Sequence, residues 1–559
     1  MIPLRLAREV TYQLERAGEH ERLASVFANI PVFLRLYRSE ARSDLLSSIR
    51  TVHEHGTDIE ELYRTRLAAL KALNPRAWAD AVPDVSLLFD DRANWTFSQQ
   101  LTVELLSWAT AHGSPRQLQN AHLRMGITHW RIGQNDEALA EYSISLDLAR
   151  QNGDKAGVSA TESNIGMLLW NQGEYRRAME CFREQLKVKE ELNDRLGVSR
   201  TYSRMGHIHV LLGEHDKAIE CYNQSLAISR SCNDRLEEAF ARGNIGAALV
   251  FVGQYDEALP YLERQYEIAS GLGARETMSK ALFNAGTVYY RKGDHARAMS
   301  AFEQHLNMAR VIGDRRAEAL ALGNIGDIYF EKGQYARAAQ FFRDKLAISQ
   351  PLGDKRGIAL AQADLGRIHL RLGEYEEAFA LLQEGEKGHR AIESHELVTE
   401  WLCEIGAIYL EVLHLNDCPN WLNQHLADLN ETSVSWRDAV LHAARTVAEE
   451  ALAIGNTNSN PAKRFTATLI LARTQAAQGE ATLALNTLET MLQHEGDDER
   501  IASLHYWLWK LRGAEEEVHQ IAALTGYEAL YSRIPKFELR KRIAELKGEP
   551  IPMSADEVN

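Results

Sequence analysis

The sequence predicts an all-α fold, in which antiparallel helix hairpins stack side by side into an α-solenoid. Two series of glycines support this prediction, because each advances in steps of 40 residues. The first series is Gly166, Gly206, Gly246, Gly286, Gly326 and Gly366, and the second is Gly173, Gly213, Gly253, Gly293, Gly333 and Gly373. A fixed period of this kind is typical of stacked helix pairs, since no single hairpin can bury its apolar face alone.

Each 40-residue unit contains two runs of apolar residues with helical spacing. In the unit 314–353 the runs are separated by Gly333, which can supply the positive φ of a tight helix-to-helix turn. Small residues such as Gly326 and Ala338 would let two helix backbones approach closely. An aromatic residue, Phe342 here, recurs in most units and is expected to fill the gap between one hairpin and the next.

A Gly-Asp or Asn-Asp pair joins one unit to the next. The pairs are Gly153-Asp154, Asn193-Asp194, Asn233-Asp234, Gly313-Asp314 and Gly353-Asp354, and Gly273-Ala274 departs from the pattern. Glycine or asparagine can end one helix in the left-handed conformation, and aspartate can cap the next helix.

The runs Asn324-Ile325-Gly326-Asp327-Ile328-Tyr329 and Gly333-Gln334-Tyr335, followed by Ala338 through Phe342, resemble a tetratricopeptide repeat. The unit is longer than the usual length of about 34 residues, and in this it is similar to the repeats of kinesin light chains and Pins-type spindle adaptors. The resemblance covers roughly Pro115 to Glu393. It implies a right-handed superhelix that binds other proteins.

Taken in chain order, the N-terminal segments 4–37 and 39–73 read as helical, and Pro83 suggests an irregular link before a helix over 96–111. Residues 416–419 interrupt the last repeat, a helix follows over 435–452, and 455–461 is the strongest loop candidate.

Three regions are therefore expected. They are an N-terminal helical region at 1–113, a repeat array at 114–433 and divergent helices with a C-terminal cap at 434–559. The array comprises six clear repeats at 154–393 and a degenerate repeat at each end.

The segment 12–23 is similar to the helical connector that follows the winged-helix region in STAND-type ATPases. This resemblance implies an alternative function, the target-sensing arm of a signalling or antiviral defence assembly. The enzymatic part would be on another chain, because this sequence has no Gly-x-x-x-x-Gly-Lys-Ser/Thr phosphate loop.

Composition bounds the function further. A formal charge of −15, from 63 basic and 78 acidic residues, argues against general nucleic-acid binding. No apolar run approaches the roughly 20 residues of a membrane span, and the first residues do not resemble a signal peptide, so we expect a cytoplasmic protein that does not bind membranes. His207 and His209 point to different faces of one helix, and no carboxylate pair stands out for acid–base work. We expect no enzymatic activity, metal or cofactor.

The first helix of each repeat is expected to line the concave side of the stack. We define the first-helix face as the residues six before, two before, one after and five after the first glycine of each unit. Asparagines recur there, and an amide can both donate to and accept from an extended peptide backbone. The residues predicted to contact a protein or peptide partner are Asn164, Arg200, Arg204, His207, Asn244, Lys280, Asn284, Arg291, Asn324, Asp327, Asp364 and Arg367. In the alternative interpretation, the asparagines bond neighbouring helices within the stack.

Charge on the first-helix face changes along the array. The early basic residues are Arg124, Arg131, Arg200, Arg204, Lys280 and Arg291, and the late acidic ones are Asp327, Glu331, Glu400, Glu404 and Glu411. This gradient predicts a polarised groove that would orient a segment acidic at one end and basic at the other. Arg367 and Arg371 break the trend, so the alternative is a set of solvated charges. The sequence thus predicts an interaction scaffold and identifies neither its partner nor its oligomeric state.

Overall fold

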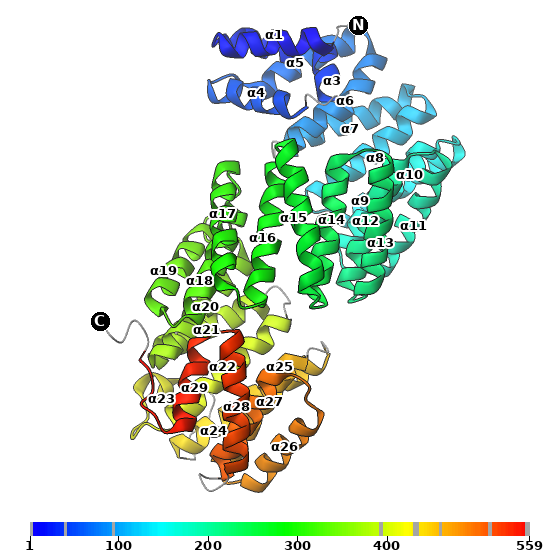
Figure 1. Ribbon diagram of the computed structural model, residues 1–559. Coiled ribbons are helices and arrows are strands. Elements are labelled where there is room, and N and C mark those ends of the chain that lie inside the picture. Colours follow the sequence, from blue (N-terminus) through cyan, green and yellow to red (C-terminus); the bar gives the residue numbers. More distant parts are fainter. Residues whose placement is uncertain are drawn as a thin grey trace. The chain divides into compact units, whose positions relative to one another are not determined.

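Helix hairpins follow one another throughout the computed structural model (Figure 1). The structure describes residues 4–38, 42–91, 95–390, 395–428, 435–457, 461–512 and 517–553, and these contain 29 helices and no strand. The chain divides into two compact units, Met1–Asn244 and Ile245–Asn559. The predicted all-α solenoid of stacked hairpins is confirmed within each unit, whereas the domain boundaries expected at 113 and 433 stay predictions.

The helices of the first unit are α1 (Leu4–Arg16), α2 (His20–Phe27), α3 (Ile30–Tyr37), α4 (Arg42–Glu54), α5 (Ile59–Leu73), α6 (Pro75–Asp91), α7 (Trp95–His112), α8 (Pro115–Arg131), α9 (Asn135–Gln151), α10 (Lys155–Asn171), α11 (Tyr175–Glu191), α12 (Arg195–Leu211) and α13 (His215–Ser231). Helix α14 (Arg235–Phe251) contains the boundary between the units. The helices of the second unit are α15 (Tyr255–Leu272), α16 (Arg275–Arg291), α17 (His295–Ile312), α18 (Arg315–Glu331), α19 (Tyr335–Ser349), α20 (Lys355–Leu372), α21 (Tyr375–Arg390), α22 (His395–Val412), α23 (Asn420–Asp428), α24 (Trp436–Thr457), α25 (Pro461–Ala477), α26 (Ala481–His494), α27 (Asp498–Arg512), α28 (Glu517–Arg533) and α29 (Phe537–Lys547).

The close approach predicted at the first glycine of each unit is confirmed. In the hairpin α16–α17, a Cβ atom added to Gly286 would lie 2.6 Å from the Phe302 ring, too close for any real contact. The same holds in α18–α19, where the distance from Gly326 to the Phe342 ring would be 2.7 Å. The ring therefore lies over the glycine of its own hairpin. The Phe342 ring also packs in one core cluster with Leu365 of the following repeat, as predicted.

The joints between hairpins follow the predicted chemistry. Asn193 has a φ of 53°, in the left-handed region, and ends α11. The side chain of Asp194 then accepts a hydrogen bond of 2.9 Å from the backbone N–H of Gly197, which caps α12. Ala274, at the equivalent joint before α16, has similar backbone angles and makes no side-chain cap.

Buried polar pairs run through the hairpins and were not predicted. The second helices carry a polar residue at one repeated position, 26 residues after a residue of the first helix. This position holds Ser145, Gln185, Ser225, Gln265, His305 and Lys345, all of them buried. The partners differ: the Ser145 hydroxyl donates to the Gln119 carbonyl at 3.0 Å, and Ser279 and His305 hydrogen bond at 2.9 Å. The repeated position therefore carries a buried polar residue in each of these hairpins, but its partner differs, and Lys345 pairs with Asp364 of the next hairpin.

The structure corrects several expectations outside the clear repeats. Pro83 lies inside α6 and does not interrupt it, because buried residues such as Trp78 and Val85 on both sides of it hold the helix in place. The segment expected to be helical from 39 to 73 is two helices, α4 and α5, separated by Gly56 with a φ of 91°.

The C-terminal region also differs from expectation. Helix α24 packs against α22 as the second helix of that repeat, after the short α23, so the interruption at 416–419 does not end the stacking. Helix α24 continues to Thr457, so the predicted loop over 455–461 is wrong at its first residues; its residues 458–460 lie outside the described part of the chain.

Candidate functional site

The accessibility of the first-helix face varies along each helix and from one repeat to the next. On α16, Lys280 and Arg291 are exposed near the two ends of the helix, and Asn284 is half-buried in the middle. On this helix the middle of the face is therefore less accessible than its two ends.

In the first unit, two predicted arginines contact neighbouring first helices. The Arg200 guanidinium on α12 forms an exposed ion pair with Glu237 of α14, with 2.5 Å between Nε and Oε1. The Arg204 guanidinium donates to the Ser163 hydroxyl of α10 at 2.7 Å. Burial and the neighbouring Arg200 lower the pKa of Arg204. Part of the positive charge expected to face a partner is therefore engaged in holding repeats together.

The remaining predicted residues of the first unit lie on the same face. The Asn164 amide donates to the Ala160 carbonyl of its own helix at 2.9 Å, so it does not bond a neighbouring helix through this donor. The His207 ring stacks on Trp170 with 5.9 Å between ring centroids. Asn244 on α14 is half-buried.

Arg124 does not belong to an accessible face. Its guanidinium is buried in an ion pair with Asp90 of α6, and it also donates to the Ser86 hydroxyl at 2.6 Å. Arg124 therefore fastens α8 to α6 and cannot contribute to a charge gradient in a groove.

In the second unit, Asn324 and Asp327 lie one helical turn apart on α18. The Asn324 Nδ2 atom is buried, and it has no hydrogen-bond partner among the described residues. Burial raises the pKa of Asp327 to about 7, and the carboxylate of Asp364 contributes to the rise. The opposing cations Arg367 and Lys345 do not cancel it. The face at this point holds a donor without an acceptor and a carboxylate that is partly protonated at neutral pH.

Asp364 and Arg367 lie on α20 beside this pair. Asp364 is buried and accepts from the Lys345 ammonium at 3.0 Å. The Arg367 guanidinium lies 3.4 Å from the other Asp364 oxygen and 4.8 Å above the Phe330 ring. The fold therefore brings together Asp327, Asp364 and Arg367, three of the predicted residues, from two adjacent repeats.

Lys345 is the member of this cluster that the binding-face prediction missed. It comes from α19, a second helix, at the repeated polar position 26 residues after Ala319. When the repeats are aligned, this lysine stands where other repeats carry serine or glutamine. That difference could have identified Lys345 from the sequence. A buried lysine needs a carboxylate partner, and Asp364 is the nearest acid of the next hairpin.

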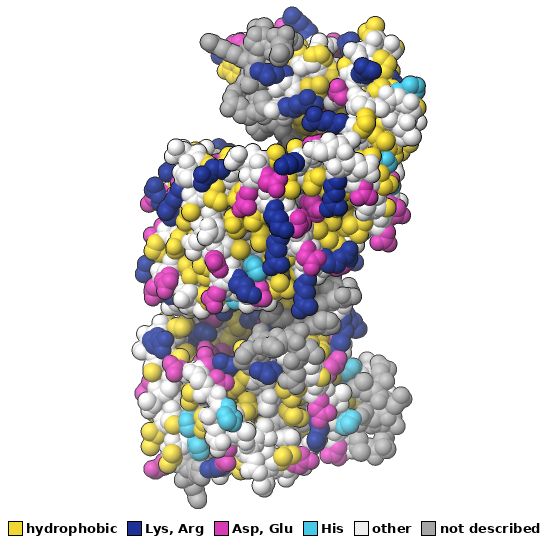
Figure 2. All heavy atoms as spheres, turned by 90° about the vertical axis from the view of Figure 1, so that its right-hand side faces the viewer, with side chains coloured by type: hydrophobic (Ala, Val, Ile, Leu, Met, Phe, Trp, Pro, Cys, Tyr) yellow, Lys and Arg dark blue, Asp and Glu magenta, His cyan; other side chains and the backbone are white. Residues whose placement is uncertain are grey.

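At the acidic end of the predicted gradient, two carboxylates form ion pairs with the chain itself. Helix α25 packs against α22, and the Lys463 ammonium lies 3.1 Å from a Glu400 carboxylate oxygen. The Arg473 guanidinium lies 3.2 Å from a Glu411 carboxylate oxygen. Since these acids already have cationic partners, they do not form a free acidic surface. On the face shown in Figure 2, basic and acidic side chains are likewise interspersed with hydrophobic ones.

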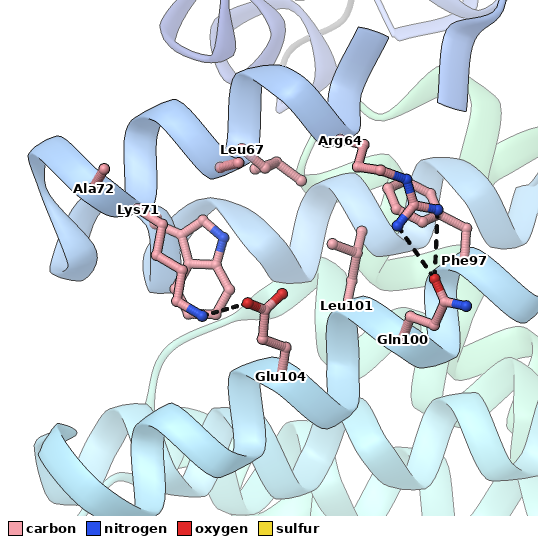
Figure 3. Close-up of a pocket in the computed structure, with 10 residues that line it drawn as sticks. Arg64, Leu67, Lys71, Ala72, Phe97, Gln100, Leu101 and Glu104 are labelled. Atoms are coloured by element: carbon pink, nitrogen blue, oxygen red, sulfur yellow. Dashed lines mark hydrogen bonds and ion pairs between the residues drawn. The ribbon is translucent and has the colours of Figure 1, made fainter. Parts of the chain in front are cut away.

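A cavity of about 380 Å³ lies between α5 and α7. Figure 3 shows how its side chains meet across the opening. The Lys71 ammonium reaches an ion pair with Glu104 and lies 4.2 Å from the Trp78 ring centroid. The Arg64 guanidinium donates to the Gln100 carbonyl oxygen at 3.4 Å. Its polar groups satisfy one another, so this cavity presents no group that calls for a ligand.

The described ranges contain neither a membrane-spanning helix nor a metal-binding cluster. None of the helices there combines the length and apolar character required to cross a membrane. Within the same residues, no three His, Cys, Asp or Glu side chains are arranged to hold a metal ion.

The sequence matches the profile of the tetratricopeptide repeat. The matches overlap and extend over residues 117–191, 157–231, 197–271, 237–311, 276–350 and 317–391. No curated protein matches the sequence.

Several solved structures are similar. A STAND protein with a tetratricopeptide repeat sensor from Pyrococcus horikoshii has 14% identity and a TM-score of 0.42, covering 86% of this chain and 74% of its own. Aspartyl phosphate phosphatase F from Bacillus subtilis has 13% identity and a TM-score of 0.44, covering 64% and 94%. A putative kinesin light chain from Podospora anserina has 11% identity and a TM-score of 0.32, covering 35% and 96%.

Proposed function

Because residues 117–391 of this chain are a tetratricopeptide repeat array, we propose that the protein is a non-catalytic interaction scaffold. Its partner is an extended protein or peptide segment that binds the first-helix face of the second unit. Asn284, Asn324, Asp327 and Arg367 supply the contacts. Stacked repeats suit this task, since their continuous side is wide enough to take a segment of many residues.

The unsatisfied amide of Asn324 on α18 carries this proposal. A buried donor without a partner costs free energy, and a ligand that supplies an acceptor recovers it. The Asn324 Nδ2 atom is such a donor. A backbone carbonyl of an extended segment is the acceptor that best fits an amide on a helix face.

Asp327 defines a second feature of the partner. Its pKa is raised because burial and Asp364 outweigh the neighbouring cations. A lysine or arginine of the partner would stabilise the ionised carboxylate and lower this pKa. The partner segment therefore carries a basic residue about one helical turn from the carbonyl that Asn324 binds.

Affinity capture with the full chain tests the proposal. We expect the variant Asn284→Ala/Asn324→Ala to lose the partners that the wild-type chain retains. The control is Gln340→Ala, an exposed residue on the second helix α19. Equal recovery of the same partners by the double variant would contradict the assigned face.

The pH dependence of binding distinguishes the contribution of Asp327 to partner affinity from that of the neighbouring residues. Peptides derived from a captured partner should bind the wild-type chain more tightly at about pH 8 than at about pH 6, because only the ionised carboxylate attracts the basic residue. In Asp327→Asn this difference should vanish, and replacing the basic residue of the peptide by alanine should weaken binding to the wild-type chain only. Fluorescence anisotropy measures each affinity.

A further inference from the structure

The C-terminal end of the second unit contacts two hairpins that lie far from it in the sequence. Ile534, between α28 and α29, lies over the turn of α16–α17: a Cβ on Gly293 would be 2.7 Å from its Cγ1. Phe537 lies over the turn of α18–α19, and a Cβ on Gly333 would be 2.7 Å from its ring. Figure 1 shows α28 and α29 in red beside the green repeats. In a stack of hairpins each unit needs contact only with its neighbours, so stacking does not require this contact.

Polar contacts fix the same segment. The Tyr335 hydroxyl donates to a Glu538 carboxylate oxygen at 3.1 Å, and Arg371 Nε lies 3.7 Å from that oxygen. The Lys536 ammonium lies 3.6 Å from a Glu331 carboxylate oxygen. Charges of opposite sign therefore meet at two points along a short stretch.

The segment from Ile534 to Glu538 has the form of a bound peptide. Its first three residues are non-helical, Lys536 has extended backbone angles, and Phe537 and Glu538 begin α29. Apart from Pro535, the residues of the segment are an apolar, a basic, an aromatic and an acidic one, in this order. Phe537 is buried against Tyr335 in an edge contact with 6.3 Å between ring centroids.

This docking surface adjoins the binding face. Glu331 and Arg371 occupy the last position of the first-helix face on α18 and α20, one turn beyond Asp327 and Arg367. A partner segment that extends along the first-helix face to this end would meet residues 534–538 of the chain itself. The two cannot share Glu331 and Arg371.

We propose that Ile534–Glu538 is an internal ligand of the array, and that its docking surface binds a partner segment of the same chemistry. That segment places a large apolar, a basic, an aromatic and an acidic residue in this order. The proposal deepens the proposed function, on which it rests for its biological use. A tethered ligand acts at an effective concentration in the millimolar range, so an external segment must displace it.

A labelled peptide with the sequence of residues 531–541 tests the proposal without any foreign partner. We expect it to bind the full chain carrying Phe537→Ala and Glu538→Arg at least tenfold more tightly than the wild-type chain, because the tail no longer competes. The control variant Glu517→Arg changes an exposed glutamate elsewhere on α28 and should behave as wild type. Equal affinity for all three chains, or no binding to the opened chain, overturns the proposal.

A second measurement guards against a variant that simply unfolds. Hydrogen exchange should increase together over 331–337 and 534–540 in Glu538→Arg, while the helices α21 and α24 keep their protection. Adding Arg371→Glu restores opposite charges at this contact and should restore protection in both segments. Unchanged exchange in Glu538→Arg, or no rescue by the second change, would count against docking. Since Asn324 and Asp327 are untouched, failure here leaves the proposed function standing, and failed partner capture leaves this test unaffected.

Discussion

Glycines on the first helices are positions where a second-helix side chain replaces the missing Cβ. The ring of Phe302 over Gly286 shows this most directly. Such a contact makes the glycine a packing requirement, although glycine lowers helix propensity by about 1 kcal/mol relative to alanine. The repeated glycine is retained because a tight crossing stabilises the hairpin more than the propensity costs.

Substitution of this glycine should therefore destabilise the chain. Gly286→Ala forces the Phe302 ring to move, and overpacking of this kind costs about 1–3 kcal/mol, more than the gain in helix propensity. The control is Gly271→Ala in α15, where no described atom lies within 4 Å of the added methyl group and stability should rise. Urea unfolding followed by circular dichroism measures both. Equal stabilisation by the two substitutions would show that the Phe302 ring moves without a cost in free energy.

Asp327 should make stability depend on pH. Because its pKa is raised in the folded state, the folded chain binds this proton more tightly than the unfolded chain. Its contribution to the free energy of unfolding therefore falls as pH rises from about 4 to about 7. We expect Asp327→Asn to exceed the wild type by about 1–3 kcal/mol at pH 8 and by less at pH 5.

Thermal unfolding at the two pH values checks this expectation. The matched control is Glu303→Gln, an exposed acid on α17, which should change little at either pH. If Asp327→Asn stabilises the chain equally at both pH values, the pKa of Asp327 is not raised in the folded chain.

Helix caps act at the scale of the element. Five of the six joints place an aspartate at the start of the next first helix, and the Asp314 side chain accepts from the backbone N–H of Ala317 at 3.0 Å. Ala274 adopts nearly the same backbone angles as Asp194 and leaves its helix without such a bond. The backbone at this joint thus has the geometry of a capped helix start, but alanine has no side-chain oxygen to accept the hydrogen bond.

Introducing that cap should stabilise the second unit. We expect Ala274→Asp to raise the free energy of unfolding by about 1 kcal/mol, through a hydrogen bond to the N–H of Thr277 and interaction with the helix dipole. Asp314→Ala should lower it by a similar amount. Differential scanning calorimetry of both variants measures the effects, and a loss of stability in Ala274→Asp would argue against the cap.

The elements differ in how far the sequence predicts them. The repeated glycines and joints predict hairpin bounds well, because turn and cap chemistry is local. Helix α6 could not be foreseen, since only tertiary burial of Trp78 and its neighbours keeps a helix intact around Pro83. At the candidate site, the position of Asp327 on the first-helix face was predictable. Its raised pKa was not, because that depends on tertiary burial and on Asp364 from another helix.

Within the second unit, the contact between Tyr335 and Glu538 joins residues 203 apart in sequence. No local pattern signals such a contact, which explains why the sequence suggested only a terminal cap. It also changes how the unit should unfold. Repeat arrays without long-range contacts lose their ends first, whereas this contact ties the last helices to the middle of the unit.

Loss of the contact should reduce the cooperativity of unfolding. We expect Phe537→Ala to broaden the urea transition of the C-terminal helices, as followed by the fluorescence of Trp507 and Trp509, so that they unfold before the central repeats. The control Val518→Ala alters a side chain that is 76% exposed on α28 and should leave the transition sharp. A single unchanged transition in Phe537→Ala would show that the docked segment does not couple the two parts.

The polar pairs inside the hairpins have a consequence for the evolution of the array. If the interiors of all hairpins were apolar and alike, two repeats could be exchanged or duplicated with little loss of stability. Here an exchange of α17 and α19 would set the Lys345 ammonium opposite Ser279 and leave Asp364 with Arg367 as its remaining cationic partner. We therefore expect an exchange of second helices between repeats to lower stability, even where the outer surfaces of the repeats look alike.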